Sequence, residues 1–112
     1  MTALAKRLVA CKYFRWMPGM SVNGMVVVDA DESGLAVVRK GIVQDWGLEY
    51  SYPDLTDPAT LGCLLALVRE AWGRPRAFCG YVEANPSYWH INTGHVGETE
   101  AAALVAALEA AP

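Results

Sequence analysis

The segment Asp57–Gly73, DPATLGCLLALVREAWG, decides the fold because it is the most strongly patterned part of the chain. Asp57 is a good N-cap residue, and the proline after it suits a first helical turn, where no amide hydrogen is needed. Gly73, followed by Pro75, is typical of a helix end. Between these signals, apolar residues recur at the spacing of one helical face. We therefore expect a central core helix that packs through Leu61, Leu64, Leu65, Val68 and Trp72.

Two pairs of strands flank this helix in the sequence. Residues 25–28 (MVVV) and 35–38 (LAVV) are apolar and rich in β-branched side chains, and a turn over residues 31–34 (DESG) joins them. Residues 77–83 and 88–93 predict a second hairpin after the helix. Residues 41–53 are ambiguous between a packed loop and a short third strand.

Helices are expected at both ends of the chain. Thr2 caps a short helix that should stop near Tyr13, and Thr99 caps another that runs to about Ala110. The predicted order is α-β-β-(β)-α-β-β-α, an α+β fold in which an antiparallel sheet of four to five strands packs with two or three helices. The two hairpins could instead lie in separate sheets.

Length and composition indicate a single domain over residues 1–112, with 54% hydrophobic and 19% charged residues, which excludes general disorder. No stretch approaches the roughly 20 apolar residues of a membrane span. Lys6 and Arg7 interrupt the first apolar segment, so no export signal is expected. The chain has three widely spaced cysteines, Cys11, Cys63 and Cys79. They are expected to be reduced thiols of a cytoplasmic protein.

The charge distribution is more informative than the net charge of −3, which argues against general duplex-DNA binding. Residues 1–28 contain four basic side chains and no acidic one, and every Asp and Glu follows them. This asymmetry permits an anionic partner near the N-terminal segment.

The segment Lys12–Met20, KYFRWMPGM, is the densest mixture of aromatic, basic and sulfur side chains. Aromatic rings combined with cations hold nucleotides and single strands, and the same composition forms protein–protein hot spots. The alternative is that Phe14 and Trp16 simply fill the core. The expected binding residues of this segment are Lys12, Tyr13, Arg15 and Trp16.

A second group of candidates follows the core helix. Arg69, Arg74 and Arg76 complement the helix dipole, or they form a guanidinium cluster for phosphate or carboxylate groups, in which Arg74 and Arg76 are the expected binding residues. Tyr88 and His90 alternate with Trp89 and Ile91, so they could line a pocket on an exposed sheet face.

No catalytic, metal or cofactor site is expected. Cys79, His90 and His95 have neither the spacing of a metal site nor the pattern of a thiol nucleophile with its base. An enzyme would require these three side chains to converge.

Three stretches carry a resemblance: RWMPGM at residues 15–20, DPATLGCLLALVREAW at 57–72 and GETEAAALVAAL at 97–108. They resemble segments of a set of small uncharacterised phage and prophage proteins, and the last is also similar to phage ABA-sandwich domains, in which helices flank a sheet. The resemblance implies a phage setting and assigns no reaction and no site residues.

The phage setting that the resemblance implies and the missing catalytic pattern together lead to one functional expectation. The chain is expected to be a non-enzymatic inhibitor of bacterial anti-phage immunity in the host cytoplasm. It would bind a defence protein, as anti-CRISPR proteins do, or sequester a nucleotide second messenger as a sponge, in a homo-oligomer. The alternative is a structural or morphogenetic phage protein that self-associates.

Overall fold

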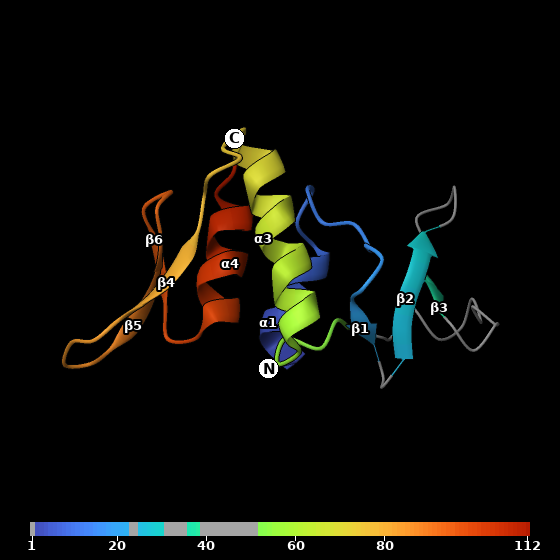
Figure 1. Ribbon diagram of the computed structural model, residues 1–112, viewed down its shortest axis with the longest axis horizontal. Coiled ribbons are helices and arrows are strands. Elements are labelled where there is room, and N and C mark those ends of the chain that lie inside the picture. The colour runs from blue at the N-terminus through green and yellow to red at the C-terminus, as the bar shows by residue number, and fades with distance from the viewer. Residues whose placement is uncertain (1, 23–24, 31–35, 39–51) are drawn as a thin grey trace.

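The computed structural model describes residues 2–22, 25–30, 36–38 and 52–112. Across these residues, three helices form a central layer, and a three-stranded antiparallel sheet lies on each side of it (Figure 1). The α+β class and the antiparallel pairing are as expected. The strands are divided between two sheets, which is the separate-sheet alternative rather than one sheet of four or five strands.

The central helix α3 (Pro58–Trp72) has the two ends that the sequence predicts. The Asp57 carboxylate accepts a hydrogen bond from the amide of Thr60 at 2.9 Å, and Gly73 closes the helix with a left-handed φ of 62°. The buried stripe is rotated from the expected one, because this helix packs against α4 (Glu100–Glu109) and also against the N-terminal segment. Its fully buried residues are Thr60, Leu64, Leu67 and Val68, whereas Leu61, Leu65 and Trp72 are half-buried.

The N-terminal half consists of α1 (Thr2–Val9) and the sheet of β1 (Ser21–Val22), β2 (Met25–Ala30) and β3 (Ala36–Val38), with β2 in the middle. β1 was not expected, and it is held to α3 by the Ser21 amide, which donates to the buried Thr60 hydroxyl at 2.8 Å. The predicted turn at 31–34, residue 35 and most of the ambiguous stretch, 41–51, lie outside the described residues.

The C-terminal sheet consists of β4 (Cys79–Val82), β5 (Tyr88–Ile91) and β6 (His95–Gly97), with β5 in the middle. β6 was also not expected; the turn before it contains Gly94, whose φ of 96° favours glycine. Gly97 marks a close approach, because a Cβ at this position would overlap backbone atoms of Ala102 and Ala103 in α4. The sheet is therefore packed tightly on that helix.

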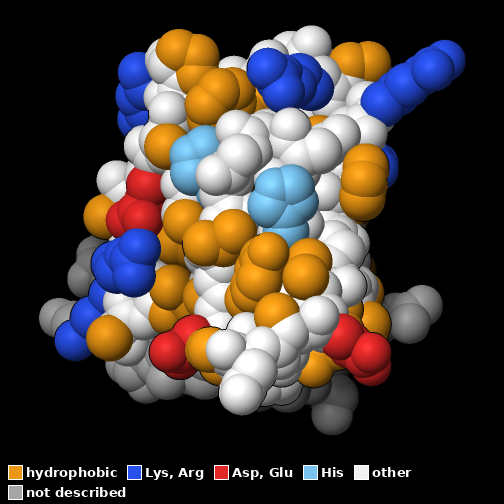
Figure 2. Space-filling view, turned by 90° about the vertical axis from the view of Figure 1, so that its left-hand side faces the viewer, with side chains coloured by type: hydrophobic (Ala, Val, Ile, Leu, Met, Phe, Trp, Pro, Cys, Tyr) orange, Lys and Arg blue, Asp and Glu red, His pale blue; other side chains and the backbone are white. Residues whose placement is uncertain are grey.

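The two faces of the C-terminal sheet differ in their surroundings. Ile91 points to the helical layer and is fully buried, together with Leu104 and Leu108 of α4. The opposite face points away from the helices, and Figure 2 shows hydrophobic side chains exposed across it. Among the residues the structure describes, no helix has the length and apolar character needed to cross a membrane.

Candidate functional site

The aromatic–basic segment, Lys12–Met20, follows α1 and leads to β1 of the N-terminal sheet. Short-range bonds shape its start, including the Phe14 amide to the Cys11 carbonyl at 3.1 Å. Its end is tied to β2, where the Gly19 amide donates to Val27 and the Val27 amide donates to Met20, both at 2.8 Å. The backbone of this segment is thus fixed at both ends.

Trp16 does not present its ring to solvent as the binding hypothesis required. Its exposed fraction is 9%, it belongs to the hydrophobic core, and it meets the Phe14 ring edge-on with centroids 5.5 Å apart. The core alternative is correct for this residue, because so large an apolar ring gains most by leaving water. Trp16 therefore cannot serve as a stacking platform for a ligand.

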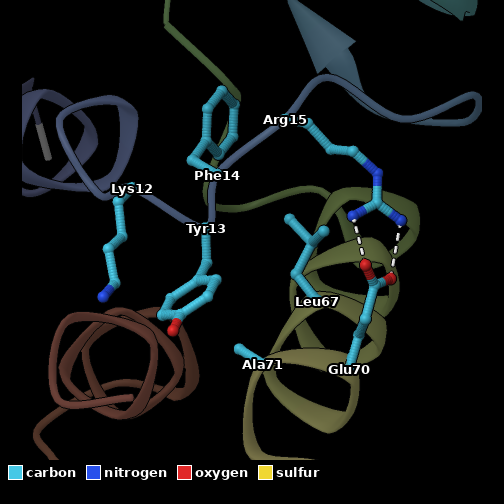
Figure 3. A pocket seen from close by; sticks show the side chains of 7 residues that line it. All are labelled: Lys12, Tyr13, Phe14, Arg15, Leu67, Glu70 and Ala71. Carbon is cyan, nitrogen blue, oxygen red and sulfur yellow. Dashed lines mark hydrogen bonds and ion pairs between the residues drawn. The ribbon is translucent and has the colours of Figure 1, made fainter. Parts of the chain in front are cut away.

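The residues before Trp16 line a hollow of about 300 Å³ above α3 (Figure 3). Tyr13 and Phe14 are half-buried, whereas Lys12 and Arg15 are exposed. α3 contributes Leu67, Glu70 and Ala71 to the wall. The hollow therefore combines aromatic and aliphatic walls with charged groups at its rim.

A second hollow of about 550 Å³ adjoins the first, since Lys12 and Tyr13 line both. It continues between α1 and the end of α4, where Arg7, Leu108 and Glu109 line it. We call the two hollows together the N-terminal groove. In its middle, the Lys12 ammonium lies 4.9 Å from the centroid of the Tyr13 ring, a cation–π distance.

Two arginine–glutamate pairs stand along this groove. Arg15 donates to both carboxylate oxygens of Glu70, at 2.8 and 2.7 Å, as Figure 3 shows. Arg7 donates from Nε to Glu109 at 3.1 Å and makes a second bond through Nη2. These hydrogen bonds lower the pKa values of the Glu70 and Glu109 carboxyl groups. The pairs hold their guanidinium groups in place and neutralise them locally.

Lys12 differs from the two arginines. Within the described residues it has no ion pair with a carboxylate. Three cations (Arg7, Lys12, Arg15) and two anions (Glu70, Glu109) line the groove, so its formal charge is 3 − 2 = +1. The remaining positive charge therefore lies at the centre, beside the Tyr13 ring.

The other predicted binding residues lie elsewhere, on the C-terminal sheet and its approach. Arg74 donates to the Asn92 carbonyl at 3.2 Å and lies over the Trp72 ring, 5.9 Å from its centroid. Arg76 is exposed. The register places Tyr88 and His90 on one face of β5 and Trp89 and Ile91 on the other, which is the predicted alternation. Arg69 donates to the Ala77 carbonyl at 2.7 Å and so holds the loop after α3.

The cysteine and histidine side chains do not converge. His90 lies on the opposite face of the sheet from Cys79 and His95, and the Ile91 strand separates those two. Burial raises the pKa of the Cys79 thiol to about 11, which is the reverse of what a nucleophile requires. In the described part of the chain, no group of histidine, cysteine and acidic residues could hold a metal ion.

Sequence reasoning missed Glu70 and Glu109, which complete the groove. One signal could have found them: four cations in an acid-free segment can only pair with carboxylates that are distant in the sequence. It also missed Val96 as an exposed neighbour of His90, because β6 was not predicted.

Comparison with known proteins adds no homologue to this geometry. No family model matches the chain, no curated protein is similar to it, and no solved structure matches it.

Proposed function

We propose that this chain is a non-enzymatic binding protein whose N-terminal groove receives part of another protein. The observation that carries the proposal is the pair of adjoining hollows, with Tyr13 and Phe14 in the walls and Lys12 at the centre. Apolar and aromatic surface beside fixed polar groups is typical of protein hot spots and ligand clefts. An acidic or aromatic side chain of a partner would fit beside Lys12.

A protein ligand agrees with the charges of the groove better than a nucleotide does. Arg15 and Arg7 already donate to carboxylates, so a phosphate would have to compete with Glu70 or Glu109 for these guanidinium groups. Trp16 is buried and offers no face for a base. A groove with a formal charge of only +1 also provides little attraction for a dianion.

The sequence resembles small phage and prophage proteins, and this resemblance suggests the class of partner. In that setting, the partner is a bacterial anti-phage defence protein, which this chain would inhibit in the cytoplasm of the host cell. Inhibition by binding requires no catalytic group, since an occupied surface on the defence protein is enough to block its action.

A plaque assay tests the proposal. The chain is expressed in bacteria that each carry one defined defence system, and plating of a restricted phage is measured. We expect plating to recover by orders of magnitude with one system. Lys12→Ala and Tyr13→Ala should abolish the recovery, whereas Lys6→Ala, which removes an exposed lysine of α1 outside both hollows, should keep it.

Two results would contradict the proposal. If plating recovers with none of the defence systems, the chain is not an inhibitor of them. If Lys6→Ala abolishes the recovery as fully as Lys12→Ala does, the groove is not the binding surface. Titration calorimetry against cyclic nucleotides checks the ligand class. Heat that disappears in the Lys12→Ala chain would show that the groove takes a nucleotide instead of a protein.

A further inference from the structure

The outer face of the C-terminal sheet is an apolar surface separate from the groove. We define it by the strand residues that share this face, Gly80, Val82, Tyr88, His90 and Val96, together with Phe78, which directly precedes β4 and whose ring lies beside Gly80. The exposed fractions are 56% for Phe78, 54% for Val96 and 36% for Tyr88. None of these residues is acidic, lysine or arginine. Exposed aromatic and aliphatic side chains that adjoin one another mark an interaction surface.

The side chains of the outer face form a continuous plate. Gly80, His90 and Val96 lie side by side across the three strands, with Val82 and Tyr88 paired further along the sheet. The Phe78 ring approaches Gly80, since a Cβ there would lie 3.8 Å from its Cε2 atom. This is ordinary contact distance, so the Phe78 ring packs on the plate beside Gly80.

Among the described residues that closely precede or follow its strands, the charged ones stand at the two ends of this plate, and their signs differ. Arg74 and Arg76 precede β4, and the bond from Arg74 to the Asn92 carbonyl places its guanidinium where β5 ends. Glu83 follows β4 and Glu98 follows β6, at the opposite end. All four are exposed. Figure 2 shows blue side chains along the upper edge of this face and red ones beside its lower part, with further red and blue side chains along its left-hand side.

We infer that a second copy of this chain covers the outer face, related by a two-fold axis that lies in the interface and runs perpendicular to the strands. Such an axis reverses the strands of the second copy, so the Arg76 end of one β4 meets the Glu83 end of the other. An axis parallel to the strands would instead stack like charges. Two sheets pack face to face in this way in β-sandwiches, and a two-fold contact uses the same patch twice.

The size of the face indicates a small and weak contact. With strands about 4.8 Å apart and a rise of about 3.4 Å per residue, the plate measures roughly 15 Å in each direction before its rim is added. A contact of this size is below the roughly 800 Å² per partner of standard complexes. We therefore expect a dimer that dissociates in the micromolar range.

Analytical ultracentrifugation of the full chain, from low micromolar to millimolar concentration, tests the inference. The average mass should rise towards twice that of the monomer. Val96→Arg places a charge on the plate, on its β6 side, and should keep the chain monomeric throughout. Val26→Arg makes the same change at an exposed valine of β2 and should leave dimerisation intact. Circular dichroism checks that both variants are folded. A wild-type chain that stays monomeric, or a Val96→Arg chain that dimerises, overturns the inference.

Charge reversal tests the direction of the two-fold axis. Arg76→Glu and Glu83→Arg should each weaken the dimer about tenfold, because each creates two like-charge contacts in a symmetric pair. The double variant should recover wild-type affinity within about threefold, since the polarity is inverted as a whole. A double variant weaker than either single variant, or singles without effect, overturns the arrangement. Lys12→Ala should leave the dimer unchanged, so this result is independent of the groove.

Discussion

The N-terminal groove and the outer face of the C-terminal sheet are both accessible surfaces with aromatic side chains, yet their charges are arranged in opposite ways. In the groove, each arginine meets a glutamate from a distant part of the sequence, Arg15 with Glu70 and Arg7 with Glu109. On the sheet, charges of one sign gather at one end and leave the middle apolar. In the groove, the ion pairs leave little net charge around a hollow that can hold a ligand. On the sheet, positive charge at one end and negative charge at the other are complementary to a second copy of the same face in the reverse direction.

The largest expected effect is on the free energy of unfolding, and it distinguishes the buried Trp16 from the exposed Lys12 of the groove. Trp16→Ala should lower the free energy of unfolding by about 3–5 kcal/mol, because it removes a ring from the core and leaves a cavity. Lys12→Ala, four residues earlier, should change it by no more than about 0.5 kcal/mol. Urea unfolding at low micromolar concentration measures both. A loss below about 1 kcal/mol for Trp16→Ala would place its ring outside the core.

A smaller effect distinguishes the inner face of the C-terminal sheet from open helix surface. Gly97→Ala should destabilise the protein by about 1–3 kcal/mol, since the new methyl group overlaps the α4 backbone. Gly62→Ala is the matched control, because nothing lies within 4 Å of the added Cβ and alanine favours the helix. This control should stabilise the protein by up to about 1 kcal/mol. If Gly97→Ala were neutral, the close packing of β6 on α4 would be wrong.

The smallest effect concerns the ion pairs of the groove and depends on pH. Because Arg15 and Arg7 lower the folded-state pKa values of Glu70 and Glu109, the pairs contribute stability above the ordinary glutamate pKa of about 4.3. This contribution is lost as the pH falls through the lowered values. It should be slight, since exposed pairs are screened by solvent.

Carboxyl titration by NMR measures these pKa values directly. Arg15→Gln should return the pKa of Glu70 towards its usual range and leave that of Glu109 low, and Arg7→Gln should do the reverse. A Glu70 carboxyl that titrates at the ordinary value in the wild-type chain would show that its pair does not persist in solution.

Local signals were sufficient for several elements of the fold. The N-cap of α3 at Asp57, its end at Gly73 and the N-cap of α4 at Thr99 are where the sequence predicts them. Caps and glycine ends depend on backbone groups within one helical turn, so neighbouring residues specify them. The alternation of Tyr88 and His90 with Trp89 and Ile91 is equally local, because side chains in a strand change sides at each residue.

The missed strands show where local signals fail. β1 has only two residues and β6 only three, so neither contains enough alternation to be recognised. Each is held by a partner from another part of the chain: the Thr60 hydroxyl binds β1, and α4 packs against Gly97 of β6. Prediction of such strands requires the tertiary neighbour that completes them.

The sequence by itself determined the α+β class, the ends of the two longest helices, the central hydrophobic helix and the acid-free basic N-terminus. These features follow from periodicity, capping and composition, which act over a few residues. Only the tertiary structure decided that Trp16 is buried while Lys12 and Arg15 border a groove, and that the strands form two sheets around the helices. The reason is physical: burial and ion pairing depend on which surfaces meet, and that is a property of the packed chain.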